Sequence, residues 1–175
     1  MKPWLQAERR SVQRAVQPEG RERRGERQIL VFDLSSEELG LDLSCVREVL
    51  RPQEIFPLPR TPGFIEGVIN LRGHIVALID LQKRLSAKPI EEKANRRIIV
   101  CKVNRFIVGL IVNNLREIIT LSGEDIRPVP EVVSMQMDAE VLSGVAKVKE
   151  KIIPILDLER ILTKKEVSEL SRLGE

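Results

Sequence analysis

Short apolar runs separated by turn residues fill the sequence from Ile29 onward. This pattern is typical of β-strands joined by tight turns. It predicts strands over residues 29–34, 38–43, 46–50, 67–71, 74–81, 97–103, 106–112, 115–121, 141–148 and 151–158. Beyond the first 28 residues, helical spacing of apolar residues is confined to 81–85 and 159–173, with 164–175 forming a C-terminal helical tail. We therefore predict a mostly β chain with short helices and a C-terminal helix.

The chain also repeats itself. Residues 38–50 align with 107–119, and residues 67–85 align with 144–162 in the same order along the chain. The aligned identities include Gly40 with Gly109, Gly67 with Gly144, and Asp80 with Asp157. We infer two similar β modules, about 29–86 and 96–163, joined by a polar stretch, and call them the first and second copies. Closure of each module into a small barrel would hide the edges of its many short strands.

The excess of basic residues lies in the N-terminal segment, before the two copies begin. The 175 residues carry a formal net charge of +3, with a pI near 9.0. Residues 1–28 hold eight of the 29 Lys+Arg and four of the 26 Asp+Glu, which leaves a body of net charge −1. We interpret residues 1–28 as a basic, disordered arm, a solvated extension rather than a weak electrostatic clamp on an acidic partner or an anionic surface.

Composition excludes several classes of function. Five aromatic residues and no Tyr argue against a stacking platform for single-stranded nucleic acid. One His and two Cys cannot supply a zinc site, and two Cys make no disulfide framework, so a cytoplasmic location is expected. Nothing resembles a membrane span or a secretory signal, so neither direct membrane insertion nor export is expected.

Catalytic motifs are equally scarce. The sequence contains no Gly-rich phosphate loop and no nucleophile elbow, so we predict no enzymatic activity, no cofactor and no metal. His74 is expected at the exposed end of a strand. Asp80 and Asp157 each follow an apolar strand and precede a helical run, which predicts that both cap helices. Cys101 alternates with apolar neighbours and is expected to be a buried structural thiol.

The segment 64–81 carries the most specific signal. Its block Asn70-Leu71-Arg72-Gly73, preceded by Gly67-Val68 and followed by an apolar strand and Asp80-Leu81, resembles the signature of the chemotaxis coupling protein family CheW. The resemblance extends over about 29–163. It implies two SH3-like five-stranded β barrels packed around a shared core, in a non-enzymatic adaptor. Such an adaptor links the cytoplasmic tip of chemoreceptors to the regulatory domain of the histidine kinase CheA.

Matching the family motif position by position implies which residues meet these partners. Gly67, Asn70, Arg72 and Gly73 occupy the family block, and the remaining two candidates, Val46 and Glu48, match a segment of receptor and kinase contact. We expect Glu48 and Arg72 to pair, because a guanidinium suits a carboxylate. Features found in both copies are interpreted as requirements of the fold. The block present only in the first copy is the better functional candidate, although Arg72-Gly73 is also compatible with a simple turn.

Two other functions remain open. One is a CheW-like docking protein of another motility or sensory pathway. The other, less favoured, is a nucleic-acid-binding β barrel that uses the basic arm, whose affinity would fall steeply with salt. Within the leading hypothesis, the groove between the barrels would receive a receptor helix.

Overall fold

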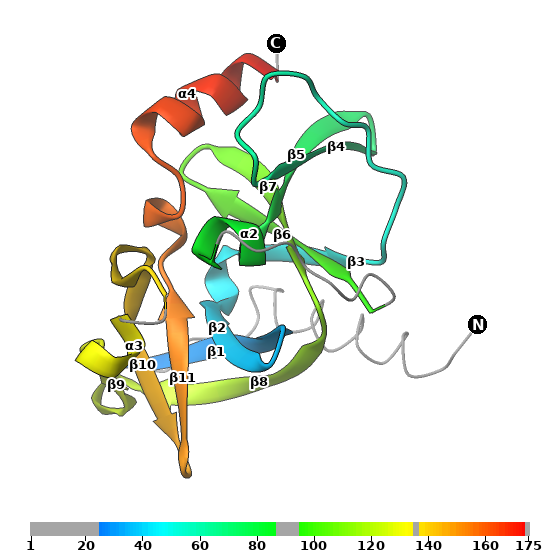
Figure 1. Cartoon of the computed structure of the whole chain (residues 1–175). Coiled ribbons are helices and arrows are strands. Elements are labelled where there is room, and N and C mark those ends of the chain that lie inside the picture. Colours follow the sequence, from blue (N-terminus) through cyan, green and yellow to red (C-terminus); the bar gives the residue numbers. More distant parts are fainter. Residues whose placement is uncertain (1–24, 87–94, 135–136, 174–175) are drawn as a thin grey trace, which may run out of the picture.

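A computed structural model describes residues 25–86, 95–134 and 137–173 (Figure 1). The strands are β1 Glu26–Leu34, β2 Glu37–Asp42, β3 Val46–Leu50, β4 Ile65–Leu71, β5 His74–Asp80, β6 Arg97–Val103, β7 Phe106–Val112, β8 Leu115–Ser122, β9 Ile126–Arg127, β10 Leu142–Val148 and β11 Lys151–Leu156. The α-helices are α2 Leu81–Ser86, α3 Glu131–Ser134 and α4 Lys164–Leu173. Single 3-10 turns are η1 Leu43–Cys45, η2 Gly123–Asp125, η3 Ala139–Val141 and η4 Leu158–Arg160. The prediction of a mostly β chain with short helices and a C-terminal helix is confirmed.

Most predicted arm residues, 1–24, lie outside the described residues, as does most of the stretch between the two copies. The last part of the predicted arm does not belong to it, because β1 begins at Glu26. Arg27 pairs with Leu121 of β8, and its Nε donates to Asp42 Oδ2 at 3.0 Å. Polar residues therefore extend the strand beyond its apolar part, because a neighbouring strand and a carboxylate satisfy them.

The strands form two sheets, which make two SH3-like barrels. One sheet has the order β8-β1-β2-β11-β10-β9, and the other has the order β3-β6-β7-β5-β4. Each sheet contains strands from both copies. The first hairpin of each copy, β1–β2 or β6–β7, lies in the sheet built from the later strands of the other copy.

This exchange corrects the predicted modules, because neither 29–86 nor 96–163 forms a barrel by itself. Two parallel pairings join the copies, with Gly40 of β2 opposite Ile155 of β11 and Gly109 of β7 opposite Leu78 of β5. The two pairings are related by the sequence repeat, since Gly40 aligns with Gly109 and Leu78 with Ile155. A repeat identifies matching strands, but it does not determine whether a hairpin pairs within its own copy or with the other.

The main core is shared by the two sheets. Buried Phe32 and Leu39 of one sheet belong to the same apolar cluster as Ile79, Ile99 and Leu110 of the other. A smaller cluster lies within the six-stranded sheet and includes Ile29 and Ile153. Burial of a common core follows from the exchange, because the chain passes from one sheet to the other after β2 and returns after β7.

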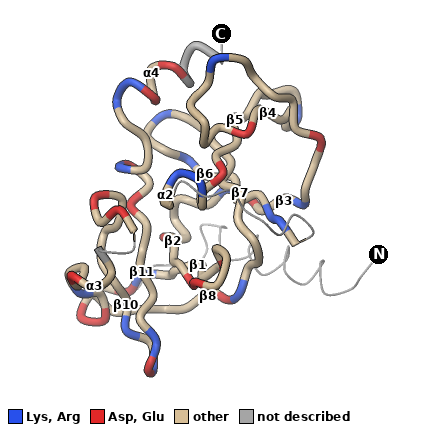
Figure 2. The backbone as a smooth tube through the Cα atoms, in the orientation of Figure 1, with Lys and Arg blue, Asp and Glu red and all other residues tan. Residues whose placement is uncertain are grey.

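Charged residues of both signs are interspersed over the described part of the molecule (Figure 2). This distribution agrees with the near-neutral body predicted from the sequence. Within the described residues, no helix has the length and apolar character needed to cross a membrane.

Close approach at the parallel pairings predicts the effect of a glycine substitution. A Cβ at Gly109 would lie 2.4 Å from Leu78 Cδ2 and 2.9 Å from Ile98 Cγ2. We expect Gly109→Ala to lower the free energy of unfolding by about 1–3 kcal/mol, the usual cost of overpacking a core. Urea denaturation measures this change. Gly123→Ala is the control, since a Cβ there meets no atom within 4 Å; equal stability of the two variants would contradict the packing argument.

Candidate functional site

The block unique to the first copy forms the turn between β4 and β5. Arg72 and Gly73 have φ angles of 51° and 85°, and both lie between the paired residues Leu71 and His74. Two successive residues with positive φ define the tight hairpin turn that matches the twist of the strands. Asn70 Oδ1 accepts a hydrogen bond of 2.9 Å from Gly73 N. The sequence motif is therefore a two-residue turn whose end is held by its own asparagine.

The predicted Glu48–Arg72 pair is present. Arg72 Nη2 donates to Glu48 Oε2 at 2.8 Å, and the Glu48 side chain is only 15% exposed. Glu48 belongs to β3 and Arg72 follows β4, which are the two edge strands of the five-stranded sheet. The ion pair thus joins the two edges of one barrel.

The ion pair leaves most of the Arg72 side chain accessible to solvent. The side chain is 74% exposed although one of its guanidinium nitrogens donates to Glu48. An ion pair at such exposure stabilises a protein by only about 0–1 kcal/mol. We call the surface formed by Glu48, Asn70, Arg72 and Gly73 the turn site.

Two predicted site residues do not belong to this surface. Val46 is 1% exposed and packs in the shared core, which corrects its prediction as a partner contact. The family resemblance placed it with Glu48 in one contact segment, but a β-bulge between Val46 and Glu48 shifts the register of the strand. Val46 therefore belongs to the core and not to the exposed surface of β3.

Gly67 is the second predicted site residue that does not belong to the turn site. The backbone of Phe56 forms a β-bridge with Val68, the residue after Gly67. A Cβ at Gly67 would lie 2.4 Å from the carbonyl oxygen of Phe56. Gly144, its repeat partner, has the same constraint, because a Cβ there would lie 2.8 Å from the carbonyl oxygen of Arg127. This agreement supports the interpretation that residues shared by both copies are required by the fold.

Apolar surface beside the turn site was missed by sequence reasoning. Ile75 is 59% exposed and pairs with Asn70 across the hairpin. Phe56 is 51% exposed and forms a bridge with Val68, farther along β4 from the turn. The only sequence signal of their exposure was position. Ile75 is the second residue after the turn, near the start of an apolar strand, and Phe56 lies among prolines. The turn site therefore combines charged, amide and apolar groups.

The polar residues weighed as catalytic candidates have structural places. Asp80 Oδ1 accepts from Lys83 N at 3.0 Å, and Asp157 Oδ1 accepts from Glu159 N at 3.1 Å, so both cap helical turns as predicted. His74 is exposed at the start of β5. Among the described residues, no three His, Cys, Asp or Glu side chains gather in a way that would hold a metal ion.

The two thiols are held in their protonated form by burial. Burial raises the pKa of Cys101 well above its ordinary value, and Cys101 Sγ donates to the carbonyl oxygen of Ile99 at 3.5 Å. The pKa of half-buried Cys45 is also raised, first by burial and then by the Asp42 carboxylate. Cys101 is therefore the structural thiol that its strand pattern predicted.

Thiol reactivity tests this assignment. We expect Cys101 to resist iodoacetamide at neutral pH in the folded chain and to react in urea, because only unfolding exposes its thiol and returns its pKa to the ordinary range. A Cys45→Ser variant isolates the Cys101 signal, read by mass spectrometry. Labelling of the folded variant as fast as of the unfolded one would contradict the assignment.

The different roles of the two glycines predict different stabilities. Gly67→Ala forces a Cβ against a backbone carbonyl, so we expect a loss of about 3 kcal/mol of unfolding free energy, at the upper end of the usual cost of overpacking. Gly73 has open space around it, and its substitution by Ala costs only the strain of a left-handed backbone, about 1 kcal/mol. Urea denaturation of both variants measures the difference. A larger loss at Gly73 than at Gly67 would contradict it.

Comparisons with known proteins agree with these features. The model of the CheW-like domain matches residues 28–166. The chemotaxis protein CheW of Klebsiella aerogenes is 32% identical over 141 residues, covering 81% of this chain and 84% of that protein. The probable chemotaxis protein CheW of Rhizobium etli is also 32% identical, covering 81% and 91%. The crystal structure of the scaffolding protein TtCheW from Thermoanaerobacter tengcongensis has a TM-score of 0.73 at 36% identity, covering 80% of this chain and 90% of that one. The chain belongs to the CheW-like domain family.

Proposed function

We propose that this chain uses the turn site to couple a histidine kinase of the CheA type to the cytoplasmic tip of chemoreceptors, as the specific form of the chemotaxis scaffold role. The observation that carries the proposal is the exposed side chain of Arg72, which pairs with Glu48 at a tight turn. Pairing in the free chain favours one orientation of the arginine and so lowers the conformational entropy that is lost on binding. Binding to the kinase and to the receptor tip would place the chain in the cytoplasm, at the receptor arrays.

Three properties of the turn site suit a protein partner. Arg72 supplies a charged donor, Asn70 is committed to the turn, and Ile75 offers apolar area next to both. Interface hot spots commonly combine an arginine with adjoining apolar surface from which water is excluded. No bond chemistry is required, and coupling would rest on simultaneous binding of two partners.

The second copy has the same turn without the Asn-Leu-Arg-Gly block, and this difference supports the choice of surface. At the equivalent turn, Lys147-Val148-Lys149-Glu150 replaces Asn70-Leu71-Arg72-Gly73. The turn keeps its left-handed first residue, with Lys149 at a φ of 57°, so the hairpin geometry does not require the block. The residues particular to the first copy are then available for recognition.

The same geometry is compatible with a docking role in another motility or sensory pathway, and the identity of the partners distinguishes the two. A nucleic-acid-binding role is less well supported, because basic and acidic residues alternate along the described part of the chain (Figure 2).

Binding of Arg72→Ala to the isolated kinase regulatory domain and to a receptor tip fragment tests the proposal. We expect about tenfold weaker binding to at least one partner, the effect of losing about 1.4 kcal/mol at an interface hot spot. Calorimetry with each partner separately assigns the turn site to the partner whose affinity falls.

Lys149→Ala is the matched control. Lys149 is an exposed cation with a φ of 57° in the equivalent turn of the second copy, in the other sheet, so its loss removes the same charge from the same backbone geometry. Unchanged affinity of Arg72→Ala for both partners would assign the turn site to the fold alone. Failure of the unmodified chain to bind either partner would overturn the kinase and receptor assignment itself.

A further inference from the structure

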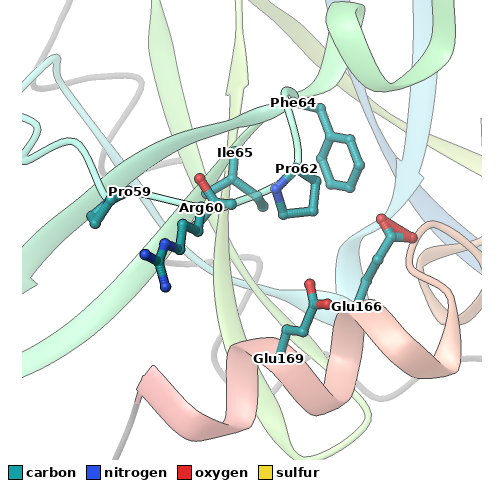
Figure 3. A pocket seen from close by; sticks show the side chains of 8 residues that line it. Pro59, Arg60, Pro62, Phe64, Ile65, Glu166 and Glu169 are labelled. Atoms are coloured by element: carbon teal, nitrogen blue, oxygen red, sulfur yellow. The ribbon is translucent and has the colours of Figure 1, made fainter.

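A cleft lies between α4 and the proline-containing segment before β4 (Figure 3). Its volume is about 120 Å³. One wall is apolar and consists of Pro59, Pro62, Phe64 and Ile65, and the other wall is α4, from which Glu166 and Glu169 extend toward that apolar wall. We call this feature the α4 cleft. It is separate from the turn site and plays no part in the coupling proposed above.

Both walls are fixed before any ligand arrives. Arg84 of α2 donates from Nε to the carbonyl oxygen of Ile161 at 2.8 Å and stacks on Phe64, with its guanidinium carbon 5.5 Å from the ring centre. Thr163 and Glu166 form a reciprocal cap at the start of α4, with Thr163 N donating to Glu166 Oε1 at 2.9 Å. A cleft held in this way loses little entropy on binding.

The charge of the cleft is incompletely matched. The Glu166 carboxylate accepts from the helix cap, whereas the partly buried Glu169 forms no hydrogen bond or ion pair with any described residue. Arg60, on the other side of the cleft, is exposed and forms no ion pair with either glutamate among the described contacts. An occupant with an apolar group and an adjoining cation would therefore complement the site, because a carboxylate beside apolar surface is stabilised by a cation.

The chain itself contains such an occupant. Residues 1–24 hold seven Lys+Arg against three Asp+Glu, and they include Trp4, the only tryptophan of the chain. A segment of this length can extend to about 80 Å, while a chain of this size has a radius of gyration of about 16 Å. The cleft is thus within reach of the segment that precedes Gly25.

We propose that residues 1–10 are an intramolecular ligand of the α4 cleft, with Trp4 against its apolar wall and Arg9 or Arg10 beside Glu169. The occupant is this chain's own arm rather than a partner, because tethering supplies an effective concentration in about the millimolar range. Even a docking equilibrium with a dissociation constant near that range would then be about half occupied. The arm would act as a tethered competitor for anything else that binds between α4 and the proline-containing segment.

Trp4 makes the test direct, since its fluorescence reports on the arm alone. We expect acrylamide to quench Trp4 about twofold less in the full chain than in a synthetic peptide of residues 1–24, the reduction that half occupancy gives. Glu169→Arg should raise quenching to the level of the peptide. The change keeps a good helix former in α4, and circular dichroism verifies that the variant is folded.

Glu140→Arg is the matched control, because Glu140 is an exposed glutamate of η3 away from the cleft, and quenching should stay as in the unmodified chain. Combining Glu169→Arg with Arg9→Glu and Arg10→Glu should restore protection of Trp4. Three results would overturn the proposal: peptide-like quenching of Trp4 in the unmodified chain, protection that Glu169→Arg leaves unchanged, or protection that rises with protein concentration and so belongs to a second copy.

Discussion

The exchange of hairpins between the two copies makes each sheet from strands of both. Each parallel pairing, β2 with β11 and β5 with β7, is reached only when strands from distant parts of the chain meet. Gly40 and Gly109 lie at these pairings, where a side chain would collide with Ile29 or Leu78. Neither barrel can therefore form without the other. The shared core is the energetic consequence, because apolar residues of both sheets bury each other.

This intertwined core leaves the chain free to vary at its hairpin ends. The turn between β4 and β5 and the turn between β10 and β11 occupy equivalent places, yet their residues differ completely. The first turn carries an arginine that pairs with a glutamate from the opposite edge strand of the sheet, and an exposed isoleucine lies beside it. A rigid scaffold with a distinct end on one barrel suits a protein whose role is to hold partners in a fixed arrangement.

Sequence patterns predicted most of the strands and the Glu48–Arg72 ion pair, because strand periodicity and charge pairing depend on local chemistry. The runs at 46–50, 97–103 and 106–112 coincide with β3, β6 and β7, and the Glu48–Arg72 pair is present. Pairings between distant strands could not be predicted in the same way. The exchange of hairpins has no sequence signal, because the strand pattern is the same whether a hairpin pairs within its own copy or with the other copy. Val46 was misplaced because a β-bulge decides its direction, and Ile75 was missed because an apolar residue in an apolar strand gives no sign of exposure.

In the proposed function, recognition resides in the turn particular to the first copy, whereas the features common to both copies serve the fold. Chemical-shift mapping of the ¹⁵N-labelled chain, titrated with the kinase regulatory domain and then with a receptor tip fragment, tests this claim most directly. We expect at least one titration to perturb the amides of Asn70, Arg72 and Ile75 while the equivalent turn at Lys149 stays unchanged. Perturbation confined to the turn at Lys149 in both titrations would contradict it.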